Sequence, residues 1–281
     1  MPEGPEVTAT KNALKRIIDL SILELSVLPG SRYHYRDHPK KMKGLNKRLP
    51  KKVLNVKKKG KFLYILLESG WSIWFTLGMT GKFIISDNPI PDKHSNFRIE
   101  LYDLDSWDTD THKPIYLFFN DSRHFGTITC CQDPSVLESK LNTLGPDILS
   151  KKTNSAVFIN KLREYPNKSL DTLLLDQKII SGIGNYIRAE ALYKARLYPF
   201  YKVKQYTNEQ LLTLFIKLKE IGRDSLLAGG TTLTNFEVLY EPGYYYLNLH
   251  VYCRKTDLYG NRVTKTKSGG RNLHWVEKLQ M

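Results

Sequence analysis

Gln177-Lys178-Ile179-Ile180-Ser181-Gly182-Ile183-Gly184-Asn185-Tyr186-Ile187-Arg188-Ala189-Glu190 is the stretch from which the fold can be worked out. It predicts a helix, a turn at Gly182 and Gly184, and a second helix that Asn185 is suited to cap. Free backbone N–H groups at the start of this second helix would bind a phosphate, and the glycines would let the backbone approach it closely. The alternative is a pair of packed helices without a ligand.

The pattern of apolar residues changes at Leu144-Gly145-Pro146-Asp147. Helical periodicity follows this point, over residues 155–164, 170–176 and 208–227. Before it, a helix over residues 7–20 leads into segments of period two, which predict strands over residues 21–28, 71–76, 96–103 and 114–120 and a hairpin around the basic turn 57–61. The sequence therefore predicts an α+β protein with a sheet-rich first half and a helical second half.

Charge and composition narrow the class of protein. The chain has 281 residues, enough for two domains, and a formal net charge of +15, which is typical of proteins that bind nucleic acid. No apolar run reaches the roughly 18 residues of a membrane span, because residues 68–70 interrupt the best candidate, 62–79. The start lacks a signal-peptide pattern, and the three cysteines do not form a disulfide framework. We expect an intracellular protein with access to nucleic acid and no contact with membranes.

The first residues, Met1-Pro2-Glu3-Gly4-Pro5-Glu6-Val7, contain groups that could carry chemistry. Removal of Met1 would leave Pro2 with a secondary amine, and an α-amino group titrates near pH 8, so part of it is unprotonated at neutral pH. Such an amine attacks sugar or carbonyl carbons and forms Schiff bases, with the help of a group that moves protons. Glu3 and Glu6 are two candidate carboxylates. The alternative is an ordinary helix start, where proline and glutamate are common.

Three loops present side chains suited to DNA. Lys61 follows Gly60 at the tip of the basic hairpin, where an ammonium can reach a phosphate. Met79 lies in a loop between glycines and could act as an apolar wedge in a duplex. Arg123 and Phe125 occur together and could pair with a base edge and stack on a base. Each of these residues could instead be structural.

The last part of the chain, about residues 247–279, predicts a small hairpin unit with Arg271 at a glycine-rich tip. Its layout is similar to a zinc ribbon, but the paired cysteines are absent. Cys253, His250 and His274 also lack the spacing of paired ligands. We therefore predict no metal.

Together, these motifs resemble the formamidopyrimidine-DNA glycosylase and endonuclease VIII family over nearly the whole chain. Each motif is weak evidence alone, but their combination in this order is specific. The motifs are Pro2-Glu3-Gly4-Pro5-Glu6, Gly60-Lys61-Phe62-Leu63, Leu77-Gly78-Met79-Thr80-Gly81, Asn120-Asp121-Ser122-Arg123-His124-Phe125-Gly126, Leu144-Gly145-Pro146-Asp147 and residues 177–190. The resemblance implies an N-terminal β-sandwich domain with a leading helix, residues 1–148, and a helical domain, residues 149–281, with a helix-two-turn-helix motif and a zincless finger. DNA would bind in the cleft between them.

The resemblance also implies roles for individual residues. Pro2 would attack the sugar C1′, Glu3 would be the acid and base that opens the deoxyribose, and Lys61 would hold a phosphate and assist catalysis. Five further residues would contact DNA: Asn185 and Arg271 at phosphates, and Met79, Arg123 and Phe125 in the gap left by a flipped-out nucleotide.

The implied protein is a monomeric, cofactor-free glycosylase and abasic-site lyase of base-excision repair, which cuts the strand by β- and δ-elimination. Its substrates would be duplexes with oxidised bases or abasic sites. The opening motif is similar to the endonuclease VIII branch, which favours oxidised pyrimidines, whereas residues 229–246 look like the loop that covers 8-oxoguanine in the formamidopyrimidine branch. We favour formamidopyrimidines and 8-oxoguanine, with oxidised pyrimidines as further substrates. The alternatives are a non-catalytic binder of damaged DNA and an RNA-binding protein.

Overall fold

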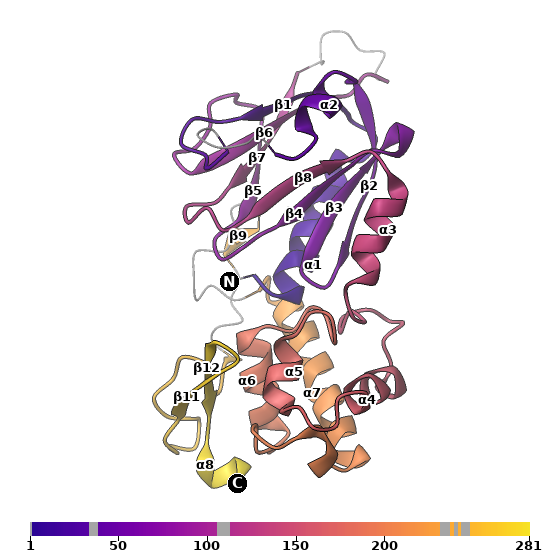
Figure 1. Cartoon of the computed structure of the whole chain (residues 1–281). Helices are drawn as coiled ribbons and strands as arrows, with labels where there is room; N and C mark the ends of the chain where they lie inside the picture. The colour runs from indigo at the N-terminus through magenta and orange to yellow at the C-terminus, as the bar shows by residue number, and fades with distance from the viewer. Residues whose placement is uncertain (1, 34–38, 106–112, 231–236, 239–240, 243–247) are drawn as a thin grey trace.

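The computed structural model describes residues 2–281 except 34–38, 106–112, 231–236, 239–240 and 243–247 (Figure 1). A sheet-rich part and a helical part lie one above the other, and a small β-hairpin stands beside the helices (Figure 1). The chain begins at the junction of the two parts. Within the described residues, no helix is long and apolar enough to cross a membrane.

The sheet-rich part starts with helix α1 (Gly4–Ala13), which continues into a 3-10 helix over Leu14–Ile17. Antiparallel strands follow, in the spatial order β5-β7-β6-β1-β2-β3-β4-β8. They are β1 (Ser21–Val27), β2 (Lys51–Lys59), β3 (Phe62–Leu67), β4 (Ser72–Thr76), β5 (Lys82–Ser86), β6 (Ser95–Tyr102), β7 (Ile115–Asn120) and β8 (Thr127–Cys131). The connections include helices α2 (Met42–Asn46) and α3 (Pro134–Asn142) and a 3-10 turn over Glu68–Gly70.

The sheet folds over into two halves of four strands, which face each other. Strands β1 and β2 pair at Ser21 with Lys52 and at Ile22 with Lys51, so the two halves are continuous at this short connection. Apolar side chains from both halves share one core, in which the rings of Phe75 (β4) and Phe83 (β5) lie 4.9 Å apart. Burial of both inner faces is what an alternating strand pattern requires, and the predicted β-sandwich is confirmed.

The helical part has its own core, which extends from Ile148, at the proposed domain boundary, to Val276 near the end of the chain. Helix α6 lies at its centre and is buried from residue 185 to residue 193. Its helices are α4 (Ser155–Arg163), α5 (Leu170–Leu175), α6 (Asn185–Lys194), the 3-10 helix Val203–Gln205, α7 (Asn208–Leu227) and α8 (Glu277–Gln280). The strands are β9 (Glu237–Val238), β10 (Glu241–Pro242), β11 (Thr264–Ser268) and β12 (Arg271–Trp275).

The prediction of a helix at the start of residues 177–190 is wrong. Residues 177–184 form turns, and α5 is the helix that precedes them. The side chain of Gln177 holds these turns, because its Nε2 donates to the carbonyl oxygens of Leu175 (3.0 Å) and Ile183 (2.9 Å), and its Oε1 accepts from the N–H of Gly182 (2.9 Å). The arrangement of helix, two turns and helix is therefore formed by α5 and α6.

Candidate active site

A cavity of about 460 Å³ brings together Pro2, Lys61 and Arg271. Pro2 comes from the extended start of the chain, Lys61 from the tip of the β2–β3 hairpin, and Arg271 from the first residue of β12. Gly78 and Gln177 line the same cavity. Residues from both parts of the chain, far apart in sequence, thus face one space where a phosphate or sugar could bind between cations.

Glu3 is held at the N-terminus of α6. Its carboxylate accepts hydrogen bonds from the backbone N–H groups of Tyr186 (3.0 Å) and Ile187 (3.3 Å), and the residue is 2% exposed. Gly184 is the N-cap, and a Cβ there would lie 2.5 Å from Cγ of Glu3 and closer still to its carboxyl carbon. The prediction that Asn185 caps this helix is wrong, because a carboxylate from the start of the chain occupies that position.

Burial shifts the protonation of two groups at this site in opposite directions. It raises the pKa of Glu3, with Glu6 adding to the effect, while the charge of Lys61 and the two N–H donors oppose it. Burial also lowers the pKa of Lys61; Glu3 opposes this effect and Arg271 adds to it. A carboxyl that keeps its proton to higher pH can act as an acid, and an ammonium that loses its proton more readily can exchange it.

Glu6 orients the first residues of the chain, and neither Glu6 nor Glu3 is itself a lining residue of the cavity. Its Oε2 accepts from the backbone N–H of Glu3 at 2.9 Å, and its Oε1 accepts from the hydroxyl groups of Tyr186 (3.1 Å) and Ser225 (3.5 Å). The residue is 1% exposed. The two candidate carboxylates therefore differ in place: Glu6 holds the backbone of Glu3, and Glu3 is the residue that follows Pro2 in the chain.

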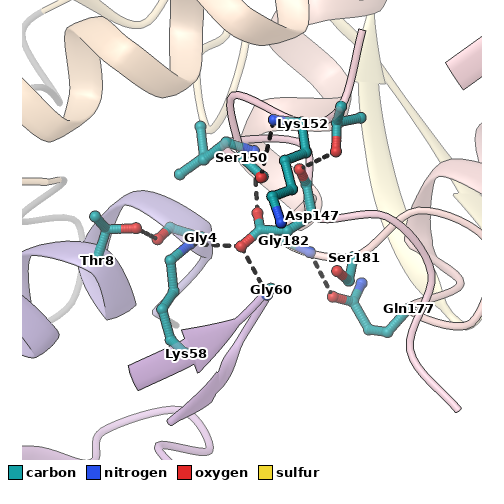
Figure 2. A network of polar contacts seen from close by, with 12 residues as sticks. Gly4, Thr8, Lys58, Gly60, Asp147, Ser150, Lys152, Gln177, Ser181 and Gly182 are labelled. Atoms are coloured by element: carbon teal, nitrogen blue, oxygen red, sulfur yellow. Dashed lines mark hydrogen bonds and ion pairs between the residues drawn. The ribbon is translucent and has the colours of Figure 1, made fainter. Parts of the chain in front are cut away.

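Asp147 holds the tip of the hairpin that carries Lys61 (Figure 2). Its Oδ2 accepts from the backbone N–H of Gly60 and from the ammonium of Lys58, each at 3.0 Å. Its Oδ1 accepts from the N–H of Leu149, also at 3.0 Å. In the sequence, this carboxylate is recognisable only as part of the boundary motif Leu144-Gly145-Pro146-Asp147.

The start of the chain and the hairpin tip both contact the turns before α6 (Figure 2). The N–H of Gly4 donates to the carbonyl oxygen of Gly182 at 2.8 Å. Gly60 has a φ of +58°, and a Cβ there would lie 2.5 Å from Cβ of Ser181. Glycine is required at this position both by the left-handed backbone and by the close approach. Three distant segments are thus joined beneath the cavity.

The three residues predicted to enter the duplex gather on two adjacent loops. The guanidinium carbon of Arg123 lies 4.9 Å from the ring centroid of Phe125, and both side chains are exposed. Met79 is half-buried in the neighbouring turn. The loops touch, because the N–H of Arg123 donates to Oγ1 of Thr80 (3.2 Å) and a Cβ on Gly78 would lie 2.6 Å from the carbonyl carbon of Phe125.

Asn185 connects α6 to the C-terminal hairpin. Its Nδ2 donates to the carbonyl oxygen of Asn272 (3.0 Å), and its Oδ1 accepts from Nη2 of Arg188 (2.6 Å). Arg188 is fully buried and lies 3.5 Å from Asp171, and burial lowers its pKa to about 10. Asn185 does not line the cavity around Pro2. In this structure it positions the residue next to Arg271.

The segment that precedes the C-terminal hairpin is fastened by a buried carboxylate. Glu190 accepts from the backbone N–H groups of His250 (2.9 Å), Val251 (2.9 Å) and Tyr252 (2.8 Å). Burial raises the pKa of Glu190, and these three donors oppose the shift. Cys253 is exposed, and the described part of the chain contains no group of three or more His, Cys, Asp or Glu side chains that could hold a metal ion.

Comparison with known proteins gives matches along the chain. The formamidopyrimidine-DNA glycosylase N-terminal domain matches residues 1–128, and the helix-two-turn-helix (H2TH) domain of the same family matches residues 144–237. A formamidopyrimidine-DNA glycosylase of Rickettsia canadensis is 30% identical over 285 residues, which cover 100% of this chain and 99% of that protein.

Two solved structures share the fold. The MutM (Fpg) protein from Thermus thermophilus has a TM-score of 0.80 and 29% identity, over 99% of this chain and 98% of that chain. The Lactococcus lactis Fpg, in a complex with DNA containing an abasic site, has a TM-score of 0.82 and 23% identity, over 99% of both chains.

Proposed function

The chain belongs to the formamidopyrimidine-DNA glycosylase family, and we propose that it is a base-excision-repair enzyme that removes oxidised bases from duplex DNA and then cuts the strand at the abasic site. The observation that carries this proposal is that Pro2, Lys61 and Arg271 line one cavity. The residue that follows Pro2, Glu3, is buried. The enzyme acts as a monomer and needs no cofactor.

In the proposed reaction, loss of Met1 frees the secondary amine of Pro2, whose nitrogen attacks C1′ of the damaged nucleotide. The bond from C1′ to the base breaks, and the base leaves with the electron pair and takes up the proton that the Pro2 nitrogen gives up. Glu3 gives its proton to the ring oxygen as the deoxyribose opens, which leaves an iminium between Pro2 and C1′. Loss of a C2′ proton then expels the 3′ phosphate, and a further elimination expels the 5′ phosphate. The raised pKa of Glu3 supports its role as the acid.

The cations and loops around the cavity support the placement of DNA there. Lys61 and Arg271 would bind the phosphates beside the lesion, because both face the cavity. A base must leave the stack before C1′ can be attacked, and the resulting gap costs a few kcal/mol. Met79, Arg123 and Phe125 would fill that gap from their two adjoining loops. We propose that Asn185 contributes to phosphate binding through its hold on β12.

We propose formamidopyrimidines and 8-oxoguanine as the preferred bases, with oxidised pyrimidines as additional substrates. The family match favours the first class. The segment expected to cover 8-oxoguanine, residues 229–246, falls largely outside the described residues. The complex of the Lactococcus lactis relative with abasic-site DNA supports such DNA as a ligand of this chain as well.

Borohydride trapping on an abasic-site duplex, followed by peptide mapping, tests the proposal. Reduction captures an imine, so we expect a covalent adduct on Pro2. The Pro2→Gly variant should bind the duplex with an affinity near that of the parent but cleave it at least ~100-fold more slowly, because a primary amine on a flexible residue replaces the secondary amine that the ring holds in place. A chain that has lost Met1 and binds the duplex without forming an adduct would instead be a non-catalytic binder of damaged DNA.

A further inference from the structure

A second and larger cavity, of about 770 Å³, has no lining residue in common with the cavity around Pro2. Its walls come from α1, from β2 and from α7. The packing of α1 and Leu149 against α7 creates it, and Gly222 of α7 permits this packing, since a Cβ there would collide with Cδ2 of Leu149. The mechanism proposed above uses none of this space.

Cations outnumber carboxylates around this cavity. The lining carboxylates, Asp147 and Glu220, are already paired with Lys58 (3.0 Å) and Lys217 (2.9 Å). Four other lining lysines have no carboxylate within 4.0 Å among the described residues: Lys11, Lys15, Lys57 and Lys219. Of these, Lys219 donates to the carbonyl oxygen of Ser150 at 2.7 Å. Burial lowers the pKa of Lys11, and the charges of Lys15 and Lys58 lower it further, so these cations repel one another. An anion would relieve this repulsion.

Part of the cavity wall is apolar and carries a few polar residues. Val56, Leu149 and Phe215 supply apolar surface. Asn55 and Tyr64 also line the cavity, and neither takes part in a side-chain hydrogen bond within the described chain. Tyr64 is 7% exposed, and burial raises its pKa, so its hydroxyl stays protonated and can donate.

We propose that this cavity binds a nucleoside phosphate. The ammonium groups of Lys11, Lys15 and Lys57 would receive the phosphates, and the apolar walls would receive the base and sugar. Asn55 and Tyr64 would provide hydrogen bonds to the edge of the base. The volume lies within the roughly 300–1,000 Å³ of small-molecule sites. An inorganic anion would leave the apolar walls in contact with water, and an uncharged ligand would leave the lysines unpaired.

Titration calorimetry with the full chain tests this site with three probes: dATP, inorganic tripolyphosphate and deoxyadenosine. We expect dATP to bind at one site and at least tenfold more tightly than either other probe, because it alone satisfies both the lysines and the apolar walls. Lys11→Glu should weaken dATP binding at least tenfold. Lys47→Glu makes the same charge change at an exposed lysine that lines neither cavity and should change the affinity less than twofold.

Ile216→Glu is a second variant that leaves the interior intact, because Ile216 lines the cavity and is 44% exposed. It should weaken dATP binding as Lys11→Glu does, while both variants cleave an abasic-site duplex at the parental rate. That rate separates this proposal from the proposed glycosylase function. Failure of dATP to bind, or equal binding of tripolyphosphate, would overturn the proposal. Displacement of dATP by an abasic-site duplex would overturn it as well, because the nucleotide would then occupy the DNA cleft.

Discussion

The contact between Gly184 and Glu3 predicts that a single methyl group will disable the site. Gly184 has a φ of −128° and a ψ of −157°, an extended conformation that alanine adopts without strain. Its Cβ would nevertheless lie 2.5 Å from Cγ of Glu3 and closer to the carboxyl carbon. Gly184→Ala therefore acts through sterics alone and must displace the carboxylate from the N-terminus of α6.

The cost follows from the contacts that are lost. Two buried N–H groups lose their acceptor, at about 1–3 kcal/mol for each hydrogen bond, and the loss of a helix cap costs about 0.5–2 kcal/mol. These terms overlap, so we expect the free energy of unfolding to fall by about 3 kcal/mol and Tm to fall by about 6–12 °C. Without Glu3 in place, cleavage of an abasic-site duplex should slow by about 100-fold, the usual contribution of a positioned acid or base.

Thermal unfolding and single-turnover strand cleavage measure the two effects. Gly44→Ala is the matched control: it lies in α2, and its Cβ would be 3.6 Å from the nearest atom, in Trp71. This control should keep full activity and lose no stability. The decisive comparison repeats Gly184→Ala in a Glu3→Ala background, where the obstructing carboxylate is absent. If the loss of stability is as large there as in the parent, the collision does not explain it and the reasoning fails.

Three further predictions concern the groups around the cavity. Asp147→Asn should slow strand cleavage about tenfold, because Lys61 would be held less firmly. The affinity for the duplex, measured by fluorescence anisotropy, should stay within threefold of the parent. An equal loss of affinity would contradict this prediction. Because the pKa of Glu3 is raised, the proton on its carboxyl stabilises the fold at low pH, and this stabilisation is lost as pH rises through that pKa. Glu3→Gln should therefore gain stability relative to the parent between pH 4 and 8, whereas a constant difference in Tm would count against it. Arg271→Ala should weaken duplex binding and reduce the slope of log affinity against log salt by about 1, and an unchanged slope would exclude the phosphate contact.

The spacing of apolar residues along the chain predicted several of the strands and helices. The alternating residues 21–28 and the amphipathic residues 208–227 correspond to β1 and α7. The helix predicted at the start of residues 177–190 is absent. The apolar pair Ile179-Ile180 fits the spacing of a helix, but the side chain of Gln177 makes the hydrogen bonds to the backbone that stabilise two turns instead. That preference arises from side-chain hydrogen bonds, which hydrophobic periodicity does not report.

The resemblance placed Pro2, Lys61 and Arg271 in one site, and the structure brings these three residues to one cavity. The supporting carboxylates could not be found in this way. Glu190 appears in the sequence as one acidic residue in an apolar helix, and its hold on residues 250–252 depends on a contact across about sixty positions. Burying a charge is costly, so an acidic residue in an apolar helix can be predicted to have hydrogen-bond donors around it. Which donors they are is seen only in the folded structure.

Glu3 links the chemistry to the arrangement of the two parts of the molecule. The carboxylate proposed as the acid is also the cap of α6, so it bridges the first residues of the chain and the centre of the helical part. The bond from Gly4 to Gly182 and the bond from Gly60 to Asp147 act across the same junction. A separation of the two parts would break these bonds, and Lys61 and Glu3 would lose their positions together. The residue proposed as the proton donor and the lysine proposed to bind a phosphate therefore depend on the same contacts between the two parts.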